Sequence, residues 1–185
     1  DGTGTVAHNC CTGDPTAEDA LMMYLGEGAE EWTDYRVEVQ FMVPNQEGQM
    51  LGLWVRGQYE EKGRKETAKE VTGYYIILAR RRLVRLLQLQ TAQDCVGACN
   101  PKWMKAFNNP YILREEKIEA IDLTRNQWHT LAVEVRGNRI GIWVDGVFAY
   151  DYVDGKEPFL TGTVGFKTFD SRPAFFDNIV VTPLE

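Results

Sequence analysis

Residues 138–152, "NRIGIWVDGVFAYDY", contain two apolar runs that meet at Asp145-Gly146. Before that pair, Ile140, Ile142 and Val144 alternate with other residues, which is the period of two of a half-buried strand. An Asp-Gly pair between two such runs is the strongest short-range signal of a β-hairpin, because both residues accept the positive backbone angles of a tight turn. A carboxylate at a strand tip can also bind a ligand, but we predict that Asp145 forms the turn.

The same alternation continues on both sides of this hairpin, and Gly, Pro and Asn residues punctuate it. Residues 73–90 are long for one strand, and "ARRR" in their middle predicts a turn between two strands; an amphipathic helix over 78–90 is the alternative. Besides the hairpin, the predicted strands are 34–43, 49–57, 74–80, 83–89, 129–137, 160–169 and 174–184. Many short strands with very little helix favour an all-β, two-sheet antiparallel sandwich of the jelly-roll type.

The length and charge of the chain limit its class. Its 185 residues predict one domain over 1–185, in which the irregular stretch 91–117 looks like a loop insertion that contains cysteines. The formal net charge of -7 argues against nucleic acid as a partner, since nucleic-acid binders usually present a basic face. No apolar run approaches the roughly 20 residues of a membrane helix, so we expect no membrane insertion.

Four cysteines form two clusters, Cys10 with Cys11 and Cys95 with Cys99. Four-thiolate metal sites usually show C-x2-C pairs, and adjacent cysteines chelate one metal poorly. We therefore expect two disulfides between the N-terminal segment and the loop, with the pairing left open. Disulfides indicate an oxidising compartment, so we expect an extracellular or cell-surface protein.

The chain shows no motif of a known catalytic chemistry: G-x-S-x-G, a Gly-rich phosphate loop and H-E-x-x-H are all absent. His129 lies at the start of a predicted strand with no nucleophile motif beside it. A glycosidase needs two carboxylates at a fixed separation, and no predicted strand carries such a pair on one face. We therefore expect a protein that is not an enzyme, with a sugar-active hydrolase as an alternative.

Aromatic residues suggest a binding surface instead. Trp54 and Arg56 are out of phase with the apolar face of strand 49–57, so both are predicted on its outer face. Lys167 and Phe169 have the same phase on strand 160–169. Aromatic faces stack on sugar rings while polar groups at their edges bind the hydroxyls, so these four residues are the candidate ligand-binding set.

Asp177 is predicted inside the strand over 174–184, where Asp is disfavoured. It can point to water, accept backbone hydrogen bonds, or bind a hard cation through its oxygens. We name Asp177 as the candidate ligand of a structural calcium ion.

From residue 128 onward, "NQWHTLAVEVRGNRIGIWVDGVFAYDYVDG" and "LTGTVGFKTFDSRPAFFDNIVV" resemble the C-terminal half of concanavalin A-like lectin/glucanase domains, closest to their laminin-G-like and 3-keto-disaccharide-hydrolase-like branches. "EEWTDYRVEVQF" and "LGLWVRG" fit the first half, and the resemblance fails over 91–117. It implies a jelly-roll sandwich whose concave sheet carries Trp54, Arg56, Lys167 and Phe169, with Asp177 near a structural calcium. The acidic pair of the glucanase branch has no match here.

These observations favour a secreted, non-catalytic carbohydrate-binding or adhesion domain that holds a glycan on its concave sheet. A structural subunit of an extracellular assembly or filament, self-associating through edge strands, is a second hypothesis. A sugar-active hydrolase is the third.

Overall fold

A computed structural model describes residues 6–8, 21–44, 50–60, 70–79, 82–89, 112–168 and 174–185. These residues form twelve strands and one short 3-10 helix, η1 (Ala29–Glu31). The strands are β1 (Val6–His8), β2 (Leu21–Met23), β3 (Tyr35–Met42), β4 (Met50–Glu60), β5 (Glu70–Ala79), β6 (Leu83–Leu89), β7 (Ile112–Lys117), β8 (Trp128–Arg136), β9 (Arg139–Val144), β10 (Val147–Val153), β11 (Thr163–Thr168) and β12 (Ala174–Pro183).

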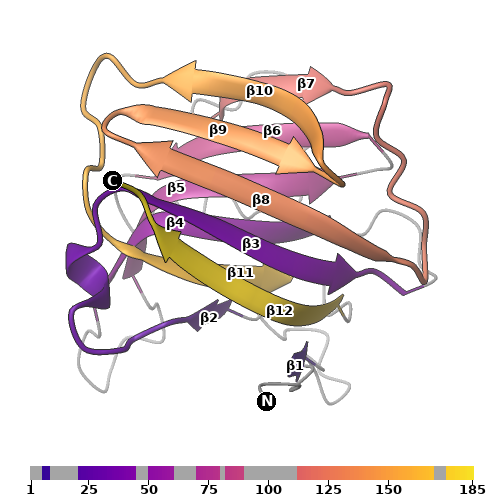
Figure 1. The fold of residues 1–185 in the computed structure, drawn as a ribbon, viewed down its shortest axis with the longest axis horizontal. Coiled ribbons are helices and arrows are strands. Elements are labelled where there is room, and N and C mark those ends of the chain that lie inside the picture. Colours follow the sequence, from indigo (N-terminus) through magenta and orange to yellow (C-terminus); the bar gives the residue numbers. More distant parts are fainter. Residues whose placement is uncertain are drawn as a thin grey trace.

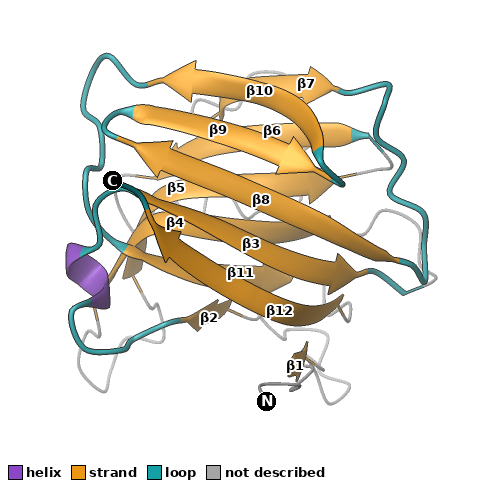
Figure 2. Ribbon diagram, viewed as in Figure 1, coloured by secondary structure: helices purple, strands orange, loops and turns teal. Residues whose placement is uncertain are grey.

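The strands form two antiparallel sheets of six, stacked face to face (Figures 1 and 2). Sheet A has the order β1-β12-β3-β8-β9-β10, and sheet B has the order β2-β11-β4-β5-β6-β7. The predicted all-β, two-sheet antiparallel sandwich is therefore confirmed. Among the described residues, no helix has the length and apolar character that a membrane crossing requires.

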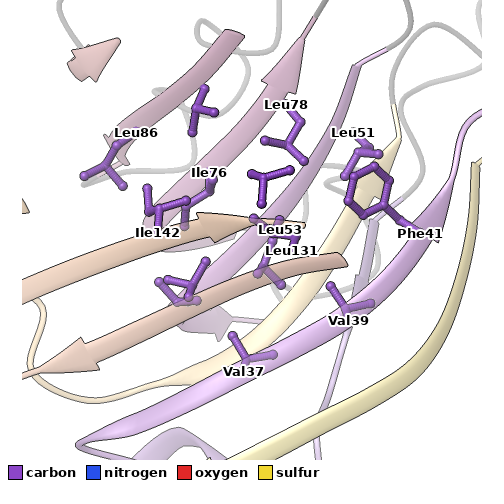
Figure 3. Packing of buried hydrophobic residues seen from close by; sticks show 14 of the residues in the cluster. Val37, Val39, Phe41, Leu51, Leu53, Ile76, Leu78, Leu86, Leu131 and Ile142 are labelled. Carbon is purple, nitrogen blue, oxygen red and sulfur yellow. The ribbon is translucent and has the colours of Figure 1, made fainter. Parts of the chain in front are cut away.

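The core lies between the sheets and follows the predicted alternation (Figure 3). In β3, Val37, Val39 and Phe41 are fully buried, whereas Glu38 between them is exposed. Leu51, Leu53 and Val55 of β4 face them from sheet B. Period-two burial on both inner faces stabilises the sandwich, because each sheet removes one apolar face from water.

The hairpin at 138–152 forms as predicted, with β9 and β10 joined by Asp145-Gly146. Both turn residues have positive φ, 50° and 74°. The Asp145 carboxylate also accepts hydrogen bonds from the Thr130 backbone N–H at 2.8 Å and pairs with Nδ1 of the buried His129 at 2.8 Å. Asp145 thus forms the turn and also holds it against the start of β8.

Asp145→Asn separates these two roles. Asn-Gly supports the same turn, and the amide oxygen can still accept from Thr130, but the carboxylate that faces His129 is lost. We expect the free energy of unfolding to fall by about 1 kcal/mol in urea titrations. A much larger loss would mean that Asn does not support the turn here.

Residues 73–90 form two strands, β5 and β6, and the alternative helix is wrong. The last six residues of the predicted insertion, 112–117, are strand β7, which pairs with β6. The alternation was hidden there because β7 lies at the edge of sheet B, where charged side chains occupy both faces. Strands β7 and β10 are edge strands of their sheets, so self-association through edges stays a prediction.

Candidate ligand face of sheet B

The strands that carry Trp54 and Lys167 are neighbours. β11 pairs with β4, so that Gly165 lies opposite Trp54 and Lys167 lies opposite Gly52. By register, all four belong to the outer face of sheet B, meaning the face turned away from sheet A. The phase argument thus placed Trp54 and Lys167 on one face.

Two rows of residues cross this outer face. The first contains Met23, Gly165, Trp54, Tyr75 and Leu87, and the second contains Leu21, Lys167, Gly52, Ile77, Arg85 and Glu115. The first row is mainly aromatic and apolar, and the second contains Lys167 near one end and Arg85 with Glu115 at the other. Aromatic and apolar area beside a few charged groups is the usual composition of a small-ligand site.

Trp54 and Tyr75 form the centre of the first row. Their rings stack with centroids 4.6 Å apart and an interplanar angle of 19°. Tyr75 also lies over Gly52, where a Cβ atom would come within 2.1 Å of the ring. Both side chains are 0% exposed, so Trp54 is not an open stacking platform as the sequence predicted.

The indole Nε1–H of Trp54 is buried and has no hydrogen-bond partner among the described residues. Buried polar atoms without a partner are rare in folded proteins, and each one calls for an explanation such as a bound water or ligand. The ring therefore contains one unused donor, enclosed within the protein.

Arg85 and Glu115 supply charged groups that the sequence reasoning missed. They face each other across β6 and β7 and form an ion pair, with side chains 13% and 35% exposed. They share a row with Lys167 only through the pairing of five strands, which no local pattern encodes. The phase of β6 was the one usable signal, since it sets Arg85 apart from the core residues Val84 and Leu86.

Arg56 does not share the outer face with Trp54, and that prediction is wrong. A β-bulge interrupts the pairing of β4 with β5 between Val55 and Gln58, and Arg56 has a positive φ of 50°. An extra residue in one strand reverses the phase of the side chains that follow it. The Arg56 side chain therefore extends toward sheet A.

The Arg56 guanidinium is 1% exposed and lies among loop oxygens at one end of the sandwich. Nη1 donates to the carbonyls of Phe159, at 2.6 Å, and Gly137. Nη2 donates to the Thr33 carbonyl at 3.2 Å and to Asp34 Oδ1 at 3.0 Å. Every one of these partners lies outside sheet B, so Arg56 ties the bulge of β4 to sheet A and its loops.

Burial lowers the pKa of the Arg56 guanidinium, and the nearby Tyr35 and Asp34 act in the opposite direction. Burial also raises the pKa of the Tyr35 hydroxyl, which accepts from the Arg56 backbone N–H at 2.7 Å. Two glycines with positive φ flank the bulge, Gly73 at 127° and Gly162 at 137°. A Cβ at either position would come within 2.6 Å of the Arg56 backbone, so close approach requires glycine there.

The remaining predicted site residues are only partly described. Phe169 and the four cysteines, Cys10, Cys11, Cys95 and Cys99, lie outside the described residues. The expected disulfides therefore stay predictions.

Asp177 lies at a bulge of β12, beside Asn178 with φ of 48°. Its Oδ1 accepts from the Asn178 backbone N–H at 2.8 Å, and the Asn178 amide donates to Gln40. In the described part of the chain, no group of three or more His, Cys, Asp or Glu residues is placed to hold a metal. Calcium usually takes six to eight oxygens, which is more than Asp177 and its described neighbours supply, so calcium at Asp177 stays a prediction.

Two stacked antiparallel sheets with this strand order define a concanavalin A-like sandwich of the lectin/glucanase type. A family model described as "3-keto-alpha-glucoside-1,2-lyase-like domain" matches residues 22–182. The chain belongs to this family. No curated protein matches the chain.

Solved structures share the fold at low sequence identity. The carbohydrate-binding module CBM66 from Bacillus subtilis has a TM-score of 0.59 at 18% identity, over 97% of this chain and 95% of that one. Sheep galectin-11, in complex with glycerol, has a TM-score of 0.53 at 10% identity, over 89% and 98% of the two chains. The exoplasmic/lumenal domain of VIP36, in its Ca2+/Man-bound form, has a TM-score of 0.61 at 10% identity, over 98% and 82%.

Proposed function

We propose that this domain binds carbohydrate on the outer face of sheet B, outside the cell and without catalysis. The observation that carries the proposal is that the neighbouring strands β11, β4, β5, β6 and β7 each place a residue in one row of the outer face. There, Lys167, Arg85 and Glu115 share a row beside the stacked Trp54–Tyr75 pair. Structures named as a carbohydrate-binding module, a galectin and a mannose-bound domain have the same fold, which supports the ligand class.

The charged row offers the hydrogen bonds that a sugar needs. Lysine and arginine donate to hydroxyl oxygens, and the Glu115 carboxylate accepts from hydroxyl hydrogens. The stacked Trp54–Tyr75 pair in the adjacent row is enclosed and holds the strands that carry these groups. Ile77 and Gly52 lie between the charged ends of the row and give it an apolar centre.

Affinity electrophoresis tests this proposal, using gels that each contain one soluble polysaccharide, such as a β-glucan, a levan or a galactomannan. We expect at least one polysaccharide to retard the wild type, and Lys167→Ala and Glu115→Gln each to weaken binding about tenfold, as for a lost charged hydrogen bond. Glu116→Gln is the matched control, since Glu116 pairs with Arg114 on the other side of the same strand. Equal retardation of all these variants would reject the proposed face.

A lyase acting on a 3-keto-glucoside is the second candidate, favoured by the description of the family. Such an elimination removes the C2 proton next to the keto group, breaks the bond between C1 and the glycosidic oxygen, and leaves a C1=C2 double bond. The glycosidic oxygen takes up a proton and departs as the alcohol. It needs a base, and Glu115 is the carboxylate that the described strands place on this face. The Glu115 carboxylate is held in an ion pair with Arg85, and we favour binding over catalysis.

Ultraviolet absorbance of the conjugated product distinguishes the two candidates. Non-catalytic binding predicts no rise in absorbance with a 3-keto-α-glucoside and wild-type protein. A rise that Glu115→Gln abolishes would establish the lyase instead.

An extracellular location rests on the four cysteines. We expect thiol titration of the unfolded, unreduced protein to find no free cysteine. Reduction should then lower the free energy of unfolding by about 2–5 kcal/mol, because disulfides restrict the unfolded chain. Four titratable thiols without reductant would contradict the disulfides and the compartment that they imply.

A further inference from the structure

Tyr24, directly after β2, forms an ordered aromatic platform at the end of the sandwich that also contains η1. Its ring stacks on Trp32 with centroids 5.4 Å apart and an interplanar angle of 23°. Trp32 in turn packs edge-on against the buried Tyr35 at 5.9 Å. The Tyr24 ring also lies against Gly26, where a Cβ would come within 2.3 Å of its hydroxyl oxygen. Packing against Trp32 and Gly26 therefore fixes the ring.

Backbone contacts hold the same residue in place. The Tyr24 N–H donates to the Val164 carbonyl at 3.0 Å, and its carbonyl accepts from the Thr163 hydroxyl at 2.7 Å. Despite these contacts, Tyr24 is 53% exposed, whereas Trp54 and Tyr75 of sheet B are 0% exposed. A ring that is both fixed and open loses little conformational entropy when a ligand stacks on it.

Polar groups lie at the same end of the sandwich. The Gln58 amide donates to the Glu30 carbonyl at 3.3 Å and to the carbonyl and hydroxyl of Thr161 at 3.2 and 3.3 Å. Trp32 joins the same cluster, because its carbonyl accepts from Gly162, the neighbour of Thr161, at 3.0 Å. Gln58, Thr161 and the Glu30 backbone thus form one hydrogen-bonded cluster that the Trp32 backbone joins.

We propose that the Tyr24 platform is a second carbohydrate-binding surface, at the end of the sandwich and separate from the outer face of sheet B. A sugar ring stacks on the exposed face of Tyr24, and its hydroxyls bind Gln58, Thr161 and Glu30. The inference rests on the proposed function for its ligand class, but its residues are independent of that face.

The charges here favour a sugar over a lipid surface. Leu25 is 65% exposed beside Tyr24, so an apolar contact with a membrane is the main competitor. Glu27, Glu30 and Glu31 are exposed at the same end. Acidic side chains oppose approach to anionic membranes, whereas carboxylates accept hydrogen bonds from sugar hydroxyls.

Tyr24→Ala tests the platform in the same polysaccharide gels. We expect it to weaken binding about tenfold through the loss of stacking, and Thr161→Ala to weaken it less. Tyr24→Phe keeps the ring and should bind like the wild type. Phe148→Ala is the matched control, because Phe148 is 50% exposed on sheet A and belongs to neither surface.

The outcomes separate this inference from the proposed function. If Tyr24→Ala and Thr161→Ala are retarded as strongly as the wild type while Glu115→Gln loses retardation, the platform is overturned and the sheet B face stands. The reverse pattern supports the platform and rejects that face. If no polysaccharide retards the wild type, both the sheet B face and the Tyr24 platform are overturned. Co-sedimentation with phosphatidylcholine vesicles that Tyr24→Ala abolishes would assign the platform to lipid and overturn the inference.

Discussion

Asp34→Ala should lower the free energy of unfolding by about 3 kcal/mol, because it leaves the Arg56 guanidinium buried without a counter-ion. Arg56 is 1% exposed, and Asp34 Oδ1 accepts from its Nη2 at 3.0 Å. The same oxygen accepts from the Gly137 backbone N–H at 2.8 Å, so the turn between β8 and β9 loses a contact as well. The expected loss is at the lower end for a buried pair, since Asp34 is 35% exposed.

Urea unfolding of three variants measures this effect. Glu38→Ala breaks the exposed Arg36–Glu38 pair and should cost less than about 1 kcal/mol. The double variant Asp34→Ala with Arg56→Met should recover part of the loss, because no unpaired charge remains in the interior. An Asp34→Ala loss as small as that of Glu38→Ala would show that Arg56 does not depend on its counter-ion.

Gly162→Ala should cost about 3 kcal/mol or more, from backbone strain together with steric overlap. Gly162 has a φ of 137°, which L residues rarely adopt. A Cβ there would lie 2.4 Å from the Arg56 carbonyl carbon, and backbone atoms cannot move aside cheaply. The bulge that directs Arg56 into the interior would have to shift.

Gly146→Ala is the control for strain alone. Gly146 also has a positive φ, 74°, but nothing lies within 4 Å of an added Cβ. We expect a loss of about 1 kcal/mol there in the same urea titrations. Equal losses at the two positions would mean that overlap with Arg56 contributes nothing.

Alternation in the sequence predicted most of the fold, because period-two burial is a local property of strands. It placed Val37 and Leu53 in the core, and it placed Asp145 in its turn. It failed at Arg56, since a bulge reverses the phase and "WVRGQ" contains no signal that sets the bulge at this residue. The glycines that permit the bulge, Gly73 and Gly162, are distant in the chain.

The candidate site was less predictable than the fold. Strand phase showed that Trp54 points away from the core, but phase does not reveal whether that outer face is covered. Arg85 and Glu115 join Lys167 only through the register of successive strand pairs. Tyr24 was missed because its exposure depends on packing against Trp32 and Gly26, not on a repeating pattern.

The buried network around Arg56 also bears on ligand binding. Arg56 follows Trp54 by two residues on β4, and Gly162 directly precedes β11, which carries Lys167. A displaced bulge would therefore move both strands of the proposed face. Variants of Arg56 should weaken glycan binding only as far as they disturb the fold.

The indole N–H signals of the five tryptophans test the central claim most directly. In two-dimensional ¹H–¹⁵N NMR spectra, Trp54→Phe identifies the Trp54 signal by its loss. Titration with an oligosaccharide of the polysaccharide that retards the protein should shift the Trp54 signal, because Trp54 lies in the row next to Lys167, Arg85 and Glu115. The signals of Trp128 and Trp143 on sheet A should stay in place. A saturated complex in which the Trp54 signal is unmoved while Trp128 or Trp143 shifts would contradict binding on the outer face of sheet B.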